Sequence, residues 1–476
     1  MSLFEPLALG PLTVPNRILL PAMVTRLSGE DGLVNEAIRD RYVRFARGGA
    51  GLVVVEAMAV HDAKSGPLLR ISNDSFVPGL RDLRRACNDV SDSRVVPQII
   101  HFLKVARSGW RQTVDTLTLD EIAAIREHYA AAAVRAREAG FDGVELHMAH
   151  AYTLSSFLSR VNPRRDAYGG TLENRLRLPS EVLSAVRRAV GDDFAVGVRF
   201  VGDEHIKNGY TVVDAALIAE RLSRLGAAWI SLSAGGKFED AIKKEGEPLY
   251  PYTGYSGDRC MPGQAYPDGA NVALATHVRA HLRRQGLETP VCAAGKIGSL
   301  ALAQSILDEG KADLIGMARA LLADPDLPRK WQAGREDLVV RCLYGNVCKA
   351  LDESFRRVTC TLWPKGSLQA PMSSDTEPPV WPTGGAALSA SYAGGQVVLT
   401  WSPATDVEGL YGYELLRAED TGILVHHGSI RARSTRWEDT RVLGGRTYRY
   451  ALRPYDLAGN KGAPSATVAI TLPPFS

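Results

Sequence analysis

The chain has 476 residues, enough for two or three domains, although one α/β barrel can absorb about 250 of them. A hydrophobic content of 45% and a charged content of 23% are ordinary for a globular protein. A net charge of +3 without a Lys/Arg cluster argues against nucleic acid or a membrane surface as partner. The sequence offers no secretory signal, no run of roughly 20 apolar residues and too few cysteines for a disulfide framework, so we expect a cytoplasmic protein.

Short apolar runs alternate with helical patterns from residue 17 to about residue 333. Each run is rich in Val, Ile or Leu without strict alternation, as expected of strands buried on both faces. The clearest helical pattern is 117–140, where Thr118 and Glu121 can form a capping box and Gly140 ends the helix. Eight strand–helix alternations of this length predict a (β/α)8 TIM barrel. The eight runs are RILLPAM (17–23), GLVVVEAMAV (51–60), RVVPQIIH (94–101), FDGVELHM (141–148), FAVGVRF (194–200), AAWISLSAG (227–235), PVCAAGKI (290–297) and ADLIGMARAL (312–321).

The composition changes after about residue 335. Three cysteines fall within 341–360, and a linker rich in Pro, Ser and Gly follows at 367–385. From about residue 387, seven short apolar runs separated by turn residues predict a β-sandwich. We therefore predict a barrel at 1–338, a cysteine-containing segment and linker at 339–378, and an all-β sandwich at 379–476.

Polar side chains gather where the predicted strands end. His147, His150 and Tyr152 follow the fourth run, and a lone histidine there would more often be structural, but three such groups together indicate a site. Because the carboxyl ends of parallel strands meet at one face of a barrel, a single ligand shared by these groups would explain all of them. The other strand-end residues are Met23 and Thr25, Gln98 and His101, Arg199, Gly295 and Lys296, and Arg319.

Six stretches carry a resemblance to a known family. They are PNRILLPAM, PQIIH, GVELHMAHAYTLSSFLSRVNPRRDAYGGTLENRLRL, VGVRF, PVCAAGKI and ADLIGMARALLADPDLPRK, and they span roughly residues 1–335. The most specific part is 143–178, in which FLS, Asn162, Arg165, YGG and ENR stand in order. Together these stretches resemble the Old Yellow Enzyme family of FMN-dependent oxidoreductases.

The resemblance implies FMN at the mouth of the barrel and NAD(P)H as its electron donor. A fixed cation near N1 and the C2 carbonyl would stabilise the negative charge of the reduced flavin, and backbone amides with an Arg fork suit a phosphate dianion. The resemblance assigns to the cofactor Pro21, Ala22 and Met23 along the flavin, Gln98 at its pyrimidine edge, Arg199 near N1, and Gly295, Lys296, Ala318 and Arg319 at the phosphate.

The resemblance also gives roles to the histidine pair. His147 and His150 would donate hydrogen bonds to the carbonyl or nitro oxygen of a substrate stacked on the flavin, which stabilises the charge that builds during hydride transfer. Tyr152, ordinarily protonated at neutral pH, would protonate the α-carbon. For His101, a structural or flavin-edge role is as reasonable as catalysis, and Glu56 is left outside the site. A zinc site is disfavoured because the pair lacks a clear third ligand nearby in sequence.

Two positions depart from the family pattern. Val24 follows Met23 where relatives often carry Cys or Thr, and valine cannot donate a hydrogen bond to the flavin C4 carbonyl, so we expect a lower reduction potential. Ala318 stands before Arg319 where Gly is common, which restricts the backbone but keeps the amide. Phosphate binding should therefore survive.

A long loop at 233–269 follows the sixth predicted strand. Long loops at the active face of a barrel are often lids, and this one carries Tyr250, Tyr252 and Tyr255. We predict that Tyr250 and Tyr255 contact the substrate, with a packed surface loop as the alternative.

The cysteine segment is similar to that of the 2,4-dienoyl-CoA reductase branch, where four cysteines hold an iron–sulfur cluster. Eleven residues separate Cys348 from Cys360, as in that branch, but Gly345 stands where a second cysteine would follow Cys342. Four thiolates are the rule for such clusters, and no C-terminal flavin domain is apparent. We interpret the segment as a degenerate cluster site, with zinc as a lesser alternative.

Residues from about 379 to 474 resemble a fibronectin type III module. Trp401 in QVVLTWSPA would fill its core, and Tyr448 after GGRT would form a tyrosine corner. Because fold alone does not give function, the module is assigned no chemistry. We favour packing or self-association, including a possible homo-oligomer.

The resulting hypothesis is an NAD(P)H-dependent ene-reductase acting on small electrophilic alkenes. One alternative is a flavin dehydrogenase of amines, which would need an aromatic bowl for a cation. A second is a binding or scaffold protein with a vestigial flavin site. Reduction of the flavin by NAD(P)H, followed by turnover with an activated alkene, would distinguish the three.

Overall fold

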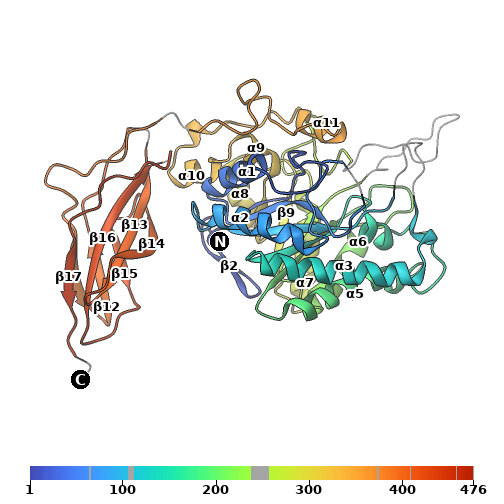
Figure 1. Cartoon of the computed structure of the whole chain (residues 1–476), viewed down its shortest axis with the longest axis horizontal. Coiled ribbons are helices and arrows are strands. Elements are labelled where there is room, and N and C mark those ends of the chain that lie inside the picture. Colours follow the sequence, from blue (N-terminus) through green and yellow to red (C-terminus); the bar gives the residue numbers. More distant parts are fainter. Residues whose placement is uncertain are drawn as a thin grey trace. The chain divides into compact units, whose positions relative to one another are not determined.

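The computed structural model describes residues 1–63, 66–104, 112–236, 257–372, 375–407, 409–456 and 458–474. The chain forms two compact units (Figure 1). The first comprises Met1–Pro325 and Val340–Ala370, and the second comprises Asp326–Val339 and Pro371–Ser476. The segment predicted at 339–378 is thus divided between the two units.

The first unit is a closed barrel of eight parallel strands, as predicted. The strands follow one another around the barrel in chain order, with β10 hydrogen-bonded to both β9 and β3. Apart from Arg94 and Ala294, every residue of these strands is buried, which explains the unbroken apolar runs of the sequence. The strands are β3 (Ile18–Leu20), β4 (Leu52–Ala59), β5 (Arg94–Ile100), β6 (Gly143–Met148), β7 (Ala195–Val201), β8 (Ile230–Ser233), β9 (Val291–Ala294) and β10 (Leu314–Gly316).

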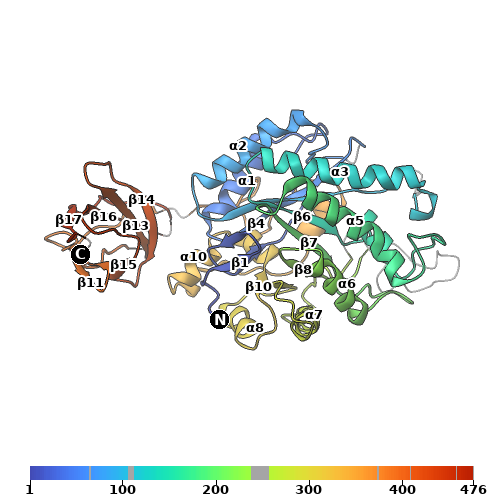
Figure 2. The ribbon, with the colours of Figure 1, turned by 90° about the horizontal axis from the view of Figure 1, so that it is seen from below.

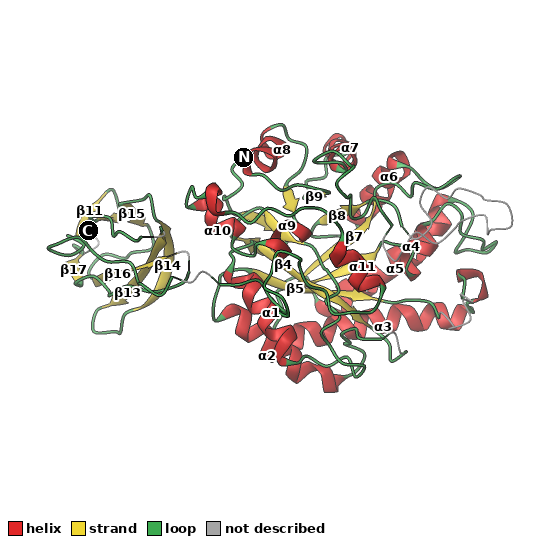
Figure 3. Cartoon of the chain, turned by 90° about the horizontal axis from the view of Figure 1, so that it is seen from above, coloured by secondary structure: helices red, strands yellow, loops and turns green. Residues whose placement is uncertain are grey.

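Helices cover the outside of the barrel (Figures 2 and 3). The predicted capping box is present at α3, where Thr118 and Glu121 each accept from the other's backbone N–H. Gly140 follows this helix with a φ of +84°, a left-handed conformation that glycine adopts without strain. The helices of this unit are α1 (Glu36–Arg47), α2 (Val77–Asn88), α3 (Leu119–Glu138), α4 (Thr153–Leu158), α5 (Leu172–Val190), α6 (Val212–Arg224), α7 (Val272–Arg284), α8 (Leu300–Asp308), α9 (Ala318–Ala323) and α11 (Val347–Glu353). Among the described residues, none of the helices is long and apolar enough to cross a bilayer.

The eighth apolar run contains a strand and a helix rather than a strand alone. β10 ends at Gly316, and α9 begins at Ala318. Arg319 therefore lies in the first turn of a helix, and the expectation that it ends the strand was wrong. The sequence did not reveal the change because the run ADLIGMARAL stays mostly apolar across both elements.

A hairpin of β1 (Leu7–Leu9) and β2 (Leu12–Val14) precedes the barrel and was not predicted. Leu9, Leu12 and Val14 belong to the same buried cluster as residues at the amino ends of the barrel strands, including Trp229. The hairpin therefore closes the amino end of the barrel with apolar side chains.

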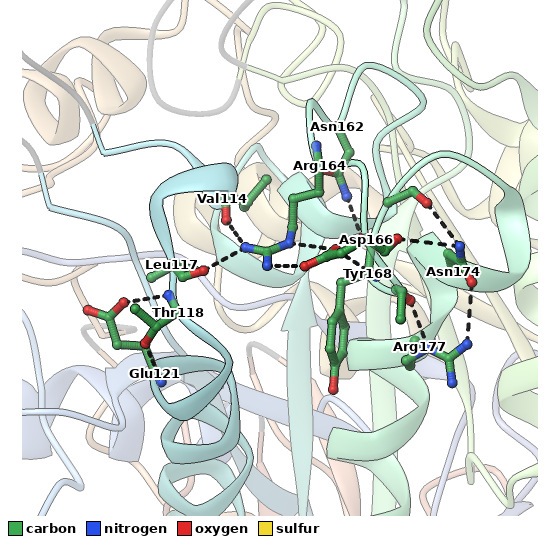
Figure 4. Close-up of polar contacts among 12 residues, drawn as sticks. Val114, Leu117, Thr118, Glu121, Asn162, Arg164, Asp166, Tyr168, Asn174 and Arg177 are labelled. Atoms are coloured by element: carbon green, nitrogen blue, oxygen red, sulfur yellow. Dashed lines mark hydrogen bonds and ion pairs between the residues drawn. The ribbon is translucent and has the colours of Figure 1, made fainter.

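The segment that carries the family resemblance most clearly is a structural brace (Figure 4). Asn162 donates to the carbonyls of Phe157 and Tyr168, and its own side-chain oxygen accepts from the N–H of Arg164. Arg164 pairs with Asp166 and donates to backbone carbonyls just before α3. These contacts fix the connection between α4 and α5, whereas Arg165 is exposed.

The cysteine-containing segment packs on the barrel. The buried guanidinium of Arg41 on α1 donates to the carbonyls of Val358 and Leu368 and lies 4.7 Å from the ring centroid of Trp363. The N–H of Val358 donates to the carbonyl of Thr25, just beyond β3 (2.8 Å). Residues 340–370 are therefore part of the barrel unit rather than a free linker.

The second unit contains seven antiparallel strands in two sheets, ordered β11-β12-β15 and β14-β13-β16-β17. Trp401 lies in its core, as predicted, and Tyr448 accepts a hydrogen bond from the N–H of Leu443 at 2.8 Å, the contact of a tyrosine corner. α10 (Leu327–Gln332) groups with these strands, and Tyr411 donates to Gln332. The strands are β11 (Ser389–Ala393), β12 (Gln396–Thr400), β13 (Leu410–Glu419), β14 (Val425–Arg431), β15 (Arg436–Asp439), β16 (Thr447–Asp456) and β17 (Val468–Thr471).

Candidate active site

A cavity of about 850 Å³ opens at the carboxyl ends of the barrel strands. Every described residue that the resemblance assigned to the cofactor, the substrate or catalysis lines it, although these residues come from six strands or the loops after them. The lining includes Pro21, Ala22, Met23, Gln98, His147, His150, Tyr152, Arg199, Gly295, Lys296, Ala318 and Arg319.

Three aromatic rings stand together on one wall of this cavity. The ring centroid of His147 lies 5.1 Å from that of His150 and 5.2 Å from that of Tyr152. The N–H of Ala149 donates to Nδ1 of His147 at 3.1 Å, so the neutral ring carries its proton on Nε2. His147 can therefore donate one hydrogen bond from Nε2.

His150 is held by an unusual backbone and a polar cluster. Its φ is +59°, and that of Ala151 is +56°, so the chain turns sharply just after β6. Nε2 of His150 lies 2.7 Å from Oγ of Ser233 and 3.1 Å from Sγ of Cys260. Cys260 also lines the cavity, and sequence reasoning gave it no role.

Gln98 on β5 and Arg199 on β7 line the cavity from the two strands that flank β6. Arg199 donates to Oγ of Ser231 at 3.0 Å, and Gln98 donates to Oε1 of Glu145 at 2.7 Å. The other oxygen of Glu145 accepts from Nε1 of Trp229 at 3.1 Å. Burial raises the pKa of the Glu145 carboxyl, while the nearby charge of Arg199 and these hydrogen bonds act in the opposite direction. The Glu145 contacts therefore fix the side-chain amide of Gln98.

Arg319 and Lys296 form a cationic corner of the cavity. Arg319 donates to the carbonyl of Pro262 at 2.9 Å and to Oδ1 of Asn346 at 2.6 Å. Burial lowers the pKa of its guanidinium. Lys296 donates to carbonyls of the 264–266 loop and pairs with Asp268 at 3.5 Å.

The adjoining backbone is strained or tightly packed. Lys296 has a φ of +58°, and Gly295 has a φ of +118° with only 2.9 Å between an added Cβ and the side chain of Asn271. A side chain at position 295 would therefore clash, and glycine is required there.

The cysteine-containing segment forms another wall of the cavity, which the sequence did not reveal. Tyr344, Cys348, Lys349, Asp352, Phe355 and Val358 line it. The ring of Tyr344 lies near both cations, 4.9 Å from the guanidinium carbon of Arg319 and 5.5 Å from Nζ of Lys296. Contacts separated by so many residues leave no local pattern in a sequence.

His101 and Glu56, two polar residues of the strand ends, lie outside the cavity lining. Nδ1 of His101 lies 2.8 Å from Oγ1 of Thr153, its ring packs on that of His61, and burial lowers its pKa to about 3. His101 thus joins β5 to α4 and has a structural position. Glu56 is fully buried behind the barrel wall, where it accepts from the N–H of Thr25 and the hydroxyl of Tyr42. Tyr250 and Tyr255 lie outside the described residues.

Comparison with known proteins agrees with this geometry. Residues 2–115, 104–248 and 263–338 match the NADH:flavin oxidoreductase / NADH oxidase family. The chain is 30% identical to an NADH oxidase of Thermoanaerobacter brockii, over 84% of this chain and 63% of that protein. It is 31% identical to an NADPH dehydrogenase of Geobacillus sp. (strain WCH70), over 68% of this chain and 92% of that protein. The histamine dehydrogenase structure from Rhizobium sp. 4-9 superposes with a TM-score of 0.66 at 26% identity, covering 79% of this chain and 55% of that one.

The barrel and its cationic, histidine-lined mouth agree with the class of flavin-binding barrels. The chain belongs to the NADH:flavin oxidoreductase / NADH oxidase family, that of Old Yellow Enzyme, whose cofactor is FMN and whose electron donor is NAD(P)H. It spans between 50% and 63% of the length of three of its curated relatives.

The cavity residues fit FMN. Arg199 and Arg319 are both buried, and among the described residues neither has a carboxylate at ion-pair distance, so each can face an anionic cofactor. Buried charges of this kind are costly unless a partner arrives. Arg319 would hold the phosphate, and Arg199 would hold the pyrimidine edge with Gln98.

The cysteines fit an iron–sulfur cluster poorly. Burial raises the pKa of the thiols of Cys342, Cys348 and Cys360, and for Cys348 the other two thiols add to the effect, so the three lie near one another. Gly345 leaves open space where a fourth thiolate would be needed. The three cysteines therefore have no assigned part in the reaction.

Proposed function

We propose that this protein reduces activated C=C bonds, those of α,β-unsaturated carbonyl or nitro compounds, at the expense of NAD(P)H. The observation that carries the proposal is the group of His147, His150 and Tyr152 on the wall of a cavity. The same cavity is lined by Arg199 and Arg319, which have no carboxylate at ion-pair distance among the described residues. FMN, when bound, supplies the hydride to the β-carbon.

His147 would bind the substrate oxygen through its Nε2 proton, and His150 would lie beside it as the second donor. Two donors directed at one oxygen stabilise the negative charge that develops there, an effect worth about 10²–10³ in rate for each donor. Tyr152 would then deliver its hydroxyl proton to the α-carbon. The apolar surface of Ala57, Leu68 and Ile100, on which the Tyr152 ring packs, would keep water from this carbon.

The experiment separates the two halves of the reaction. Tyr152→Phe should leave the reduction of bound FMN by NAD(P)H unchanged and lower the reduction of 2-cyclohexenone by about 10²-fold or more. Tyr168→Phe is a matched control, because Tyr168 bonds Glu181 away from the cavity, and it should behave as wild type. Equal loss in both halves, or full activity of Tyr152→Phe, would refute the assigned role.

A dehydrogenase of amines is the second candidate, supported by the likeness to histamine dehydrogenase and by the aromatic side chains of Phe102, Tyr344 and Phe355 in the cavity lining. Anaerobic mixing with primary and tertiary amines tests it. Bleaching of the flavin by an amine, without reduction by NAD(P)H, would favour this candidate. A flavin that neither donor reduces would favour a binding protein.

A further inference from the structure

Cys260 is a cavity residue that the proposed reaction does not use. It follows β8 in sequence and lines the cavity together with His147, His150 and Tyr152. Its side chain is partly exposed, so small molecules that enter the cavity can reach the sulfur.

Cys260, His150 and Ser233 form a closed triangle of polar atoms. Sγ lies 3.1 Å from Nε2 of His150, Nε2 lies 2.7 Å from Oγ of Ser233, and that hydroxyl donates to Sγ at 3.3 Å. If Nε2 carries no proton, the hydroxyl and thiol protons can satisfy only two of the three contacts. If Nε2 has taken up the thiol proton, its N–H is shared between Oγ and Sγ, the hydroxyl donates to Sγ, and all three contacts are hydrogen bonds.

The arrangement that satisfies every contact makes the sulfur an acceptor only. Such donation stabilises the thiolate, which is the nucleophilic form of cysteine. A nucleophile within hydrogen-bond reach of a base, with a third group orienting the pair, is the general signature of an activated side chain. Here the pair stands in the cavity proposed to receive electron-poor alkenes.

We propose that Cys260 is a nucleophile of the substrate cavity that adds to the β-carbon of electron-poor alkenes. An S–C bond forms as the C=C π bond breaks, and the thiol proton, taken up by His150, is delivered to the α-carbon. The product is a saturated thioether on Cys260. The reaction is an addition, so no oxidant or reductant takes part. The choice of electron-poor alkenes as the ligand rests on the proposed function. Alkenes that are reduced slowly form the thioether on Cys260 instead.

The test uses the purified holoprotein with 2-cyclohexenone and no NAD(P)H, followed by intact-mass measurement and peptide mapping. Addition of one alkene at Cys260 is expected. Cys260 should react roughly tenfold or more faster than Cys342, Cys348 and Cys360, because burial raises the pKa of those three thiols whereas Cys260 contacts a base. Those three thiols are also partly exposed and serve as internal references.

Variants and a second assay make the outcome decisive. Cys260→Ser should lose the adduct, Ser233→Ala should slow its formation, and Cys342→Ser should label as wild type does. Equal labelling of all partly exposed cysteines, or none at Cys260, overturns the inference. Reduction of cyclohexenone with NAD(P)H is measured separately: reduction without a Cys260 adduct refutes only this inference, and an adduct without reduction refutes only the proposed function.

Discussion

The two ends of the barrel are filled by different kinds of side chain. At the amino ends of the strands, the β1–β2 hairpin places Leu9, Leu12 and Val14 against strand residues such as Leu52 and Leu314. At the carboxyl ends, the buried side chains that line the cavity include histidines, arginines and a glutamine. One end is an apolar plug, and the other is a polar mouth.

This difference separates stability from chemistry. Burial of apolar side chains is favourable by roughly 25 cal/mol per Å², whereas buried polar groups cost free energy until they find partners. The plug therefore stabilises the fold, whereas the mouth holds buried polar groups that are suited to bind a ligand. Glu145 links the two ends, because it accepts hydrogen bonds from Trp229 of the plug and from Gln98 of the mouth.

The largest expected effect lies at the plug. Leu9→Ala removes a fully buried side chain and should lower the free energy of unfolding by about 2–5 kcal/mol. Urea unfolding followed by circular dichroism measures it. Leu119→Ala, at a leucine that is 62% exposed, is the control and should change stability little. A plug that tolerated Leu9→Ala as well as this control would contradict its assigned role.

Substitutions at the mouth should lower activity strongly and stability only a little. His147→Ala is expected to lower the rate of enone reduction by about 10²–10³-fold, because one donor to the developing oxyanion is lost. Its stability cost should be smaller, about 1 kcal/mol for the hydrogen bond that Nδ1 accepts from Ala149. Steady-state kinetics and thermal unfolding on the same sample report both. His277→Ala, at an exposed histidine of α7, should leave both values unchanged.

The sequence revealed the barrel because its signals are local. Each buried strand is a short apolar run, and the capping box at Thr118 and Glu121 lies within four residues. The β1–β2 hairpin escaped because its strands have three residues each, too few to show a period. The helix of Arg319 escaped because an apolar run continues from the strand into it.

The candidate site was predictable only where it follows strand ends. His147, His150 and Arg199 stand at such ends, and the barrel topology brings them together. Cys260 contacts His150 across 110 residues of sequence, and Tyr344 reaches the cavity from the cysteine-containing segment, which we interpret as a degenerate cluster site. These contacts depend on tertiary packing, and no periodicity or short motif encodes them.

The buried carboxyl of Glu56 should make stability depend on pH, and the expected effect is of intermediate size. Burial raises the pKa of Glu56 from 4.5 to about 7, and its hydrogen bonds from Thr25 and Tyr42 only partly oppose this. Between those pH values the folded protein keeps a proton that the unfolded chain has lost. The contribution of Glu56 to stability is therefore present below pH 4.5 and declines as the pH rises to about 7.

Glu56→Gln mimics the protonated side chain and should remove this decline. Compared with wild type, its melting temperature should be relatively higher at pH 8 than at pH 5. Glu127→Gln, at an exposed glutamate of α3, should follow the wild-type profile. Parallel profiles for wild type and Glu56→Gln would show that Glu56 is ionised throughout this range.

The smallest expected effect concerns Val24 at the mouth. Val24 lines the cavity and packs on the apolar cluster that contains Ala57 and Ile100, so it offers the flavin no hydrogen bond. Val24→Thr keeps the shape and adds a hydroxyl. A donor to the flavin C4 carbonyl binds the more negative reduced form better, and a net hydrogen bond of about 0.5–1.5 kcal/mol raises a two-electron midpoint potential by roughly 10–30 mV.

Spectroelectrochemical titration of the bound flavin measures this shift. Val24→Ala removes the same apolar contacts without adding a donor, and its midpoint should stay close to that of wild type. If Val24→Thr and Val24→Ala had the same potential, the hydroxyl would not reach the flavin. The cofactor would then be tuned by the other polar groups of the mouth, such as Arg199, a fixed cation whose attraction grows as negative charge collects near it.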